Sequence, residues 1–261
     1  MKFGITQGRL TNEKKGILQK FPLKWDKEFD FLKFINLDYI ELFLEKKINK
    51  DNPIWTKVGQ KKLLEKLKET NLNHHVVCDN YILNKSLDNL NLIKYYKKLF
   101  KSIKAINCKL LIIPIEKKNF SKKNISKFLN FIFFLKQESK KYKIKISLEV
   151  NENFKVFNKF LTTSKMNDIQ ITFDTGNFYL KNKNVFENLI KYYPHINHIH
   201  LKDRNKLGEN VIFGTGKINF INLIKFLKKK RYNKLITFET NRGKIALDTA
   251  INNLKIVKNS I

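Results

Sequence analysis

The chain has 261 residues, of which 42% are hydrophobic and 22 are Phe, so it is long and apolar enough for one large domain with a substantial core. No apolar run approaches the roughly 20 residues needed to cross a bilayer, and the first residues lack a secretory signal pattern, which argues against a membrane-spanning or secreted protein. The formal charge of +30 comes from 53 Lys and Arg against 23 Asp and Glu. Because Lys is scattered over nearly every helix-like segment, we predict a solvated surface. A field that attracts polyanions or phosphorylated substrates is the alternative.

Strand-like and helix-like segments alternate along the whole chain. The expected strands are short β-branched or aromatic runs bounded by polar residues, at 2–8, 38–44, 74–79, 110–115, 145–150, 169–174, 196–201 and 235–239. Between them, apolar residues at three-to-four spacing predict helices at 26–36, 57–70, 87–106, 122–141, 153–163, 184–193, 219–230 and 244–258.

This alternation predicts an α/β fold, a (β/α)₈ TIM barrel, as a single domain over residues 1–261. Eight strand-then-helix units without a long linker are typical of that closed barrel. The run 110–115 is continuously apolar, as expected for a parallel strand covered on both faces. A doubly wound open sheet is the rival architecture, but no Gly-rich dinucleotide fingerprint follows the first strand.

Four potential metal ligands stand at the ends of the last four predicted strands: Glu149, Asp174, His200 and Glu239. The carboxyl ends of barrel strands share one rim, where catalytic groups lie, so we expect these side chains to converge. Three carboxylates and one imidazole suit a divalent ion such as Mn²⁺, Co²⁺, Mg²⁺ or Zn²⁺ with open coordination positions. His198 should lie one layer deeper than His200, because alternate residues of a strand face the same side.

A divalent ion held by these four side chains is suited to proton transfer at a carbon next to a carbonyl group. The ion would polarise the carbonyl and adjacent hydroxyl of an open-chain sugar and stabilise the enediolate that forms when a carbon-bound proton leaves. Carboxylates on either face could remove and return that proton, which gives epimerisation or aldose–ketose isomerisation. Glu149 and Glu239 are the candidates for these catalytic roles, although spacing alone does not assign them.

Other polar side chains at the same rim are candidates for substrate binding: Gln7, Arg9, Glu41, Asn177, Lys202 and Arg242. Forked guanidinium groups in a chain that otherwise uses Lys suggest recognition of an oxyanion. The turn at 214–216, Gly-Thr-Gly, precedes a predicted helix and could offer backbone N–H groups to phosphate. A phosphosugar or acidic sugar is one interpretation, and an ordinary tight turn explains the two glycines equally well.

Several segments together resemble one family of barrels: GITQGRL at 4–10, NLDYIE at 36–41, FDTGN at 173–177, HIHLKDR at 198–204, GTG at 214–216 and FET at 238–240. The chain resembles bacterial sugar phosphate isomerase/epimerase proteins of the xylose isomerase-like TIM barrel superfamily, which also includes ketose 3-epimerases, inosose dehydratases and type IV apurinic endonucleases. The resemblance implies that Glu149, Asp174, His200 and Glu239 are metal ligands and that the two Glu form the proton-transfer pair. Many epimerases of the superfamily carry His where this chain has Asn177, so the substrate stays open.

Three alternatives compete with an isomerase. A dehydratase acting on a cyclic polyol or keto sugar would use the same metal and bases. A type IV endonuclease would need additional His ligands, and this chain has five His with none after His200, so nucleic acid is not the expected partner. A barrel retained only for binding is the third.

We expect a small sugar or phosphosugar partner, no membrane contact and a cytoplasmic location in which Cys78 and Cys108 are buried free thiols. The oligomeric state, including a homo-oligomer, stays open.

Overall fold

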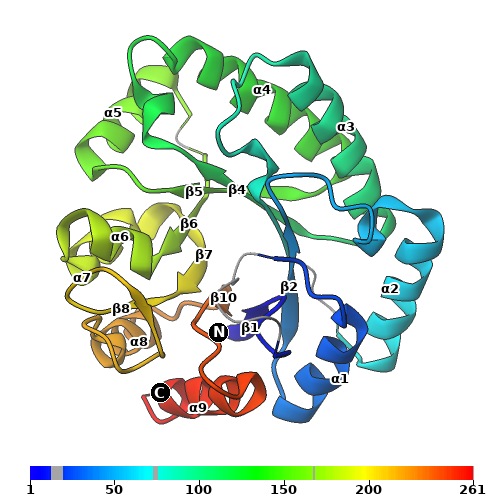
Figure 1. The fold of residues 1–261 in the computed structure, drawn as a ribbon. Coiled ribbons are helices and arrows are strands. Elements are labelled where there is room, and N and C mark those ends of the chain that lie inside the picture. Colours follow the sequence, from blue (N-terminus) through cyan, green and yellow to red (C-terminus); the bar gives the residue numbers. More distant parts are fainter. Residues whose placement is uncertain (13–19, 73–75, 167, 261) are drawn as a thin grey trace.

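The computed structural model describes residues 1–12, 20–72, 76–166 and 168–260. In this part of the chain, eight parallel strands close into a barrel in the order β1-β10-β7-β6-β5-β4-β3-β2, with helices around the outside (Figure 1). The strands are β1 (Lys2–Thr6), β2 (Tyr39–Leu44), β3 (Val76–Asp79), β4 (Leu110–Ile115), β5 (Lys145–Val150), β6 (Ile171–Asp174), β7 (Ile196–Leu201) and β10 (Leu235–Phe238). The predicted TIM barrel is confirmed.

The strand limits follow the prediction closely. β4, β5 and β7 have the predicted limits, and β1, β2, β6 and β10 are one or two residues shorter. β1 ends early because the chain turns at Gly8, whose φ of 84° lies in the left-handed region that glycine adopts without strain. Residues 74 and 75 of the predicted third strand lie outside the described residues.

Eight helices correspond to the predicted ones: α1 (Trp25–Ile35), α2 (Lys57–Glu69), α3 (Leu90–Ala105), α4 (Ile125–Tyr142), α5 (Phe154–Ser164), α7 (Val185–Tyr192), α8 (Phe220–Lys229) and α9 (Ala246–Lys258). Short 3₁₀ turns lie in the loops: η1 (Pro53–Trp55), η2 (Asn80–Ile82), η3 (Lys117–Phe120) and η4 (Tyr193–His195). Asn side chains cap several helices by accepting a backbone N–H, as Asn153 does from Lys155. Within the described residues, every helix lacks the combination of length and apolar character that a bilayer span requires.

Two elements were not predicted from the sequence. Helix α6 (Thr175–Asn182) begins directly after β6, and a two-stranded antiparallel ribbon, β8 (Asp203–Arg204) with β9 (Asn210–Val211), follows β7. α6 has only eight residues, and its N-cap is Asp174, the last residue of a strand. Because Asp174 belongs to the strand pattern, the sequence did not reveal that it also begins a helix.

Along each strand, side chains alternate between facing the helices and facing the inside of the barrel. Outward residues such as Leu111 and Phe173 belong to the large core beneath the helices. Inward residues including Tyr39 and Leu110 form a second, smaller cluster. Two residues further along β2, the inward position is the buried Glu41. The fold thus places polar groups at the carboxyl ends of the strands, above an apolar layer.

Candidate metal and active site

The four predicted ligands come together at the carboxyl end of the barrel. Glu149 lies in β5, Asp174 ends β6, His200 lies in β7 and Glu239 directly follows β10. Ligand atoms of Glu149, Asp174 and His200 all lie within 4.8 Å of one another. His200 Nδ1 is 3.2 Å from Glu239 Oε2 and 3.8 Å from Glu149 Oε2. Two carboxylates thus flank one nitrogen of His200, and Asp174 lies beside Glu149 and His200, a donor set that fits a divalent cation.

Asn177 connects two of these carboxylates. As the N-cap of α6, Asp174 accepts the backbone N–H of Asn177 through Oδ1 at 2.9 Å. The Asn177 side-chain amide in turn donates to Glu149 Oε1 at 2.7 Å. A single residue therefore fixes the orientation of Glu149 relative to Asp174.

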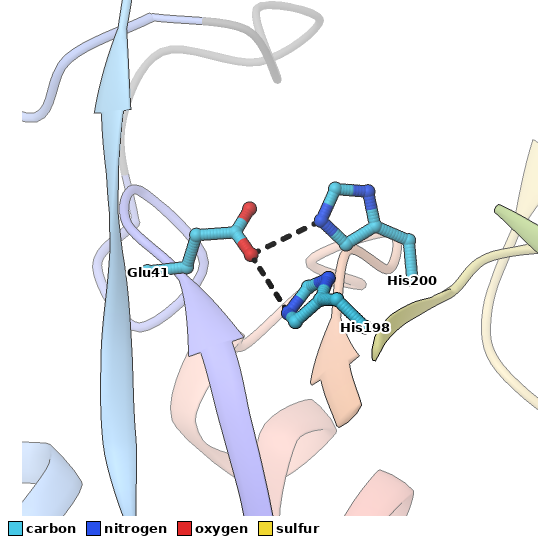
Figure 2. A group of neighbouring side chains, drawn as sticks. All are labelled: Glu41, His198 and His200. Carbon is cyan, nitrogen blue, oxygen red and sulfur yellow. Dashed lines mark hydrogen bonds and ion pairs between the residues drawn. The ribbon is translucent and has the colours of Figure 1, made fainter. Parts of the chain in front are cut away.

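The second ring nitrogen of His200 faces Glu41, which extends inward from β2 (Figure 2). Glu41 Oε2 lies 3.0 Å from His200 Nε2 and 3.4 Å from His198 Nε2. The hydroxyl groups of Thr6 and Thr237 donate to the same carboxylate at 3.4 and 3.0 Å. Glu41 is 0% exposed, so this carboxylate is shielded from solvent.

Glu41, His198 and His200 form a second group whose ligand atoms lie within 4.8 Å of one another. His198 Nε2 is 2.8 Å from the Thr237 hydroxyl, which also contacts Glu41. Because this group is fully buried, whereas Glu149 lines a cavity, we take the group of Glu149, Asp174 and His200 as the candidate metal site. His198 lies in the deeper layer that the strand pattern predicted.

The Lys202 ammonium lies between two of the candidate ligands. Its Nζ is 2.9 Å from Asp174 Oδ2 and 2.9 Å from Glu239 Oε2. Burial acts to lower the pKa of Lys202, but Asp174 and Glu239 outweigh burial and raise that pKa above its ordinary value. The site therefore already attracts one positive charge, in keeping with a cation-binding donor set.

The two glutamates of the site differ in proton affinity. Burial raises the pKa of Glu149 to about 8, and Asp174 and Glu239 add to the increase against the opposing effect of His200. Burial acts in the same direction on Glu239, but Lys202 and His200 hold its pKa well below the usual value. For His200, Glu41 and Glu239 overcome the effect of burial and raise its pKa well above the ordinary value.

A cavity of about 790 Å³ adjoins the candidate ligands, within the size range of small-molecule sites. Glu149, Asn177, Lys202 and Glu239 contribute to its wall. Residues at or after the ends of β2, β3, β4 and β5 form the remainder. Two of the four candidate ligands, Glu149 and Glu239, are thus accessible to a ligand from the cavity.

The other predicted substrate-binding residues do not line this cavity. Gln7, Arg9, Glu41 and Arg242 are 1%, 2%, 0% and 8% exposed, respectively, and lie behind its wall. Gln7 Oε1 accepts the backbone N–H of Phe43 at 3.3 Å, so this side chain contacts the carboxyl-terminal part of β2. Direct contact of these four side chains with a substrate stays a prediction.

Comparison with known proteins assigns this barrel to a family. A model of the xylose isomerase-like TIM barrel family matches residues 29–260. The chain belongs to this family. Among curated proteins, an uncharacterized protein of Methanocaldococcus jannaschii is 42% identical over 91 residues, which are 34% of this chain and about a third of that relative's own length.

Solved structures agree with the xylose isomerase-like assignment at the level of fold. A D-psicose 3-epimerase from Clostridium cellulolyticum H10, solved with D-tagatose, is 13% identical with a TM-score of 0.76, over 100% of this chain and 99% of that one. A probable 3-DHS dehydratase from Bacillus anthracis is 13% identical with a TM-score of 0.78, over 99% of both chains. The IOLI protein, solved with a zinc atom, is 18% identical with a TM-score of 0.73, over 100% and 99%. Similarity at this identity concerns the fold alone.

In this xylose isomerase-like barrel the glycine turn at 214–216 is closed by an internal carboxylate. The backbone N–H groups of Gly214 and Gly216 donate to Asp203 Oδ2 at 3.0 and 2.8 Å, and that of Arg204 donates to Oδ1 at 2.8 Å. Asp203 is 0% exposed. Because the chain's own carboxylate takes the N–H groups that a phosphate would need, the ordinary-turn interpretation is the correct one for this segment.

Sequence reasoning missed Glu28, which holds the loop that carries Arg9. This buried carboxylate of α1 accepts the backbone N–H groups of Gly8 at 2.8 Å and Leu10 at 3.1 Å, and the Thr11 hydroxyl at 3.2 Å. A signal was present in the sequence, because position 28 shares the helix face of Leu32, which belongs to the core. A carboxylate on that face indicates a buried partner.

Proposed function

We propose that this protein is a divalent-metal-dependent isomerase or epimerase acting on a sugar or a related hydroxy-carbonyl compound. The observation that carries the proposal is the convergence of Glu149, Asp174, His200 and Glu239 beside a cavity of about 790 Å³. Membership of the xylose isomerase-like family and the fold of the psicose epimerase support the same class of reaction.

The reaction would combine a metal ion with two carboxylates. A Mn²⁺, Co²⁺, Mg²⁺ or Zn²⁺ ion held by the four groups would supply Lewis-acid polarisation of the substrate carbonyl and its neighbouring hydroxyl. Glu149 and Glu239 come from positions separated by β6 and β7 in the barrel, so they reach the cavity from different sides. One removes a carbon-bound proton and the other returns a proton, which yields an epimer or an isomer according to the carbon that receives it.

Glu41 is proposed to orient His200. A carboxylate 3.0 Å from Nε2 can accept the proton of that nitrogen, which leaves the lone pair of Nδ1 directed at the candidate metal position. Histidine ligands of metals commonly have such a carboxylate partner.

Asn177 and Lys202 are the proposed substrate-binding residues. Both line the cavity and contact a candidate ligand, Asn177 through Glu149 and Lys202 through Asp174 and Glu239. Their amide and ammonium groups could donate to hydroxyl or carbonyl oxygens of a sugar.

The test is a solvent-exchange assay. Purified protein loaded with Mn²⁺ would be incubated in heavy water with a panel of ketoses, aldoses and their phosphates, and NMR would detect deuterium at carbon and new sugar isomers. We expect turnover of at least one member, and its near-complete loss in Glu239→Gln with the fold retained. Glu116→Gln, outside the cavity wall, is the matched control. Wild-type turnover by Glu239→Gln would contradict the proposal.

Dehydration of a keto sugar or polyol is the second candidate, because the probable 3-DHS dehydratase shares this fold along nearly the full chain. The same carboxylates would remove a carbon-bound proton while a hydroxyl group leaves as water. The NMR assay separates the two reactions, since a dehydratase yields a product with one water fewer, whereas an isomerase conserves the composition.

A further inference from the structure

A second cavity lies at the opposite end of the barrel from the candidate metal site. It has a volume of about 900 Å³ and adjoins the amino-terminal ends of β4, β5 and β10, together with α4. Leu110, Ile146 and Leu235, each at or near the start of its strand, contribute apolar surface to it. Three more aliphatic residues, Ile132 from α4 among them, extend this surface.

Lysine side chains surround the apolar surface. Seven of the eighteen lining residues are Lys, although Lys makes up less than a fifth of the whole chain. Asp168 is the one carboxylate among those eighteen lining residues, and Lys136 contacts both of its oxygens at 2.8 and 2.7 Å. Lys is therefore about twice as frequent among the lining residues as in the whole chain.

Most of these cations have no compensating charge. Among the described residues, Lys109, Lys140, Lys143 and Lys145 form no ion pair with a carboxylate. Lys234 lies against the Ile196 carbonyl at 2.7 Å. Burial and then the charge of Lys145 lower the pKa of Lys234. An anion placed among these side chains would relieve that mutual repulsion.

We propose that this cavity binds a small organic polyanion with an apolar or aromatic body, of the nucleoside polyphosphate type. Several Lys side chains match two or more negative charges, and the apolar surface matches a flat ring system. A cavity of about 900 Å³ at one end of the barrel has the size of a compact ligand rather than that of an extended nucleic acid strand. This site is independent of the metal site, since the two cavities share no lining residue.

Isothermal titration calorimetry of the full chain, at physiological salt and with EDTA present, tests the proposal with ATP and with inorganic tripolyphosphate. We expect one ATP per chain with a Kd below about 100 µM. Tripolyphosphate should bind more weakly because it lacks the apolar body. Lys145→Gln with Lys234→Gln should weaken ATP binding about tenfold or more.

The matched control removes two charges elsewhere. Lys62→Gln with Lys68→Gln alters exposed side chains of α2 that do not line the cavity, and should change the Kd less than about twofold. The proposal is overturned if ATP does not bind, if both double variants lose affinity equally, or if tripolyphosphate binds as tightly as ATP. Tighter binding of a single-stranded oligonucleotide than of ATP would also overturn it in favour of a nucleic acid surface. Melting curves of all variants establish that they fold.

Discussion

Replacing Glu28 by Gln should change how the stability of the protein depends on pH. The Glu28 carboxylate is 0% exposed and accepts hydrogen bonds from Gly8, Leu10 and Thr11. Burial outweighs these hydrogen bonds and raises the pKa of Glu28 from 4.5 to about 7. Between those two values the unfolded chain releases its proton while the folded chain keeps it.

The expected magnitude follows from that shift. Stability contributed by protonated Glu28 is fully present below pH 4.5, falls as the pH rises, and is lost above about pH 7. At about 1.4 kcal/mol per pKa unit, the loss amounts to about 3 kcal/mol. Gln carries no proton to lose, so Glu28→Gln should lack this part of the pH dependence.

Equilibrium urea unfolding at several values between pH 4.5 and pH 8 measures the effect as a difference between two proteins. The free energy of unfolding of the wild type, relative to Glu28→Gln, should fall by about 3 kcal/mol across that window. All other titrating groups are common to both proteins and cancel. Glu116→Gln, a more exposed exchange of the same kind, should track the wild type. Parallel pH profiles for the wild type and Glu28→Gln would refute the reasoning.

Three further predictions concern the site and the neighbouring turn. Glu41→Gln should lower Mn²⁺ affinity about 10–100-fold in calorimetric titration, because His200 loses the carboxylate that orients it; unchanged affinity would remove Glu41 from this role. Lys202→Met should tighten Mn²⁺ binding about tenfold or more, because the competing ammonium is gone, and weaker binding in the same titration would contradict that competition. Asp203→Asn should cost about 2–3 kcal/mol in urea unfolding, because its side-chain NH₂ would replace one of the two acceptor oxygens and leave either Gly214 and Gly216 or Arg204 without an acceptor, while Mn²⁺ affinity should stay at the wild-type value. A destabilisation below about 0.5 kcal/mol would show that Asp203 is not the closing group of this turn.

The sequence alone determined the barrel and the positions of its candidate ligands. Apolar runs of the right length alternated with helical periodicity, and the limits of β4, β5 and β7 were predicted to the residue. Parallel strands send their carboxyl ends to one rim, and alternation along each strand decides which residues face inward. Glu149 and Asp174 could therefore be grouped without knowledge of any contact, because both rules are local to the strand.

Only the tertiary structure decided which polar residues at that rim reach the cavity. Glu41 and His200 are 159 residues apart, and their contact depends on how β2 and β7 face each other across the closed barrel. Asp203 takes the N–H groups of the glycine turn, and Glu28 takes those beside Arg9, each across a loop whose path the sequence pattern does not specify. Periodicity fixes the face of an element on which a side chain lies. The partner it meets there depends on barrel closure and loop geometry, which arise from the packing of the whole chain.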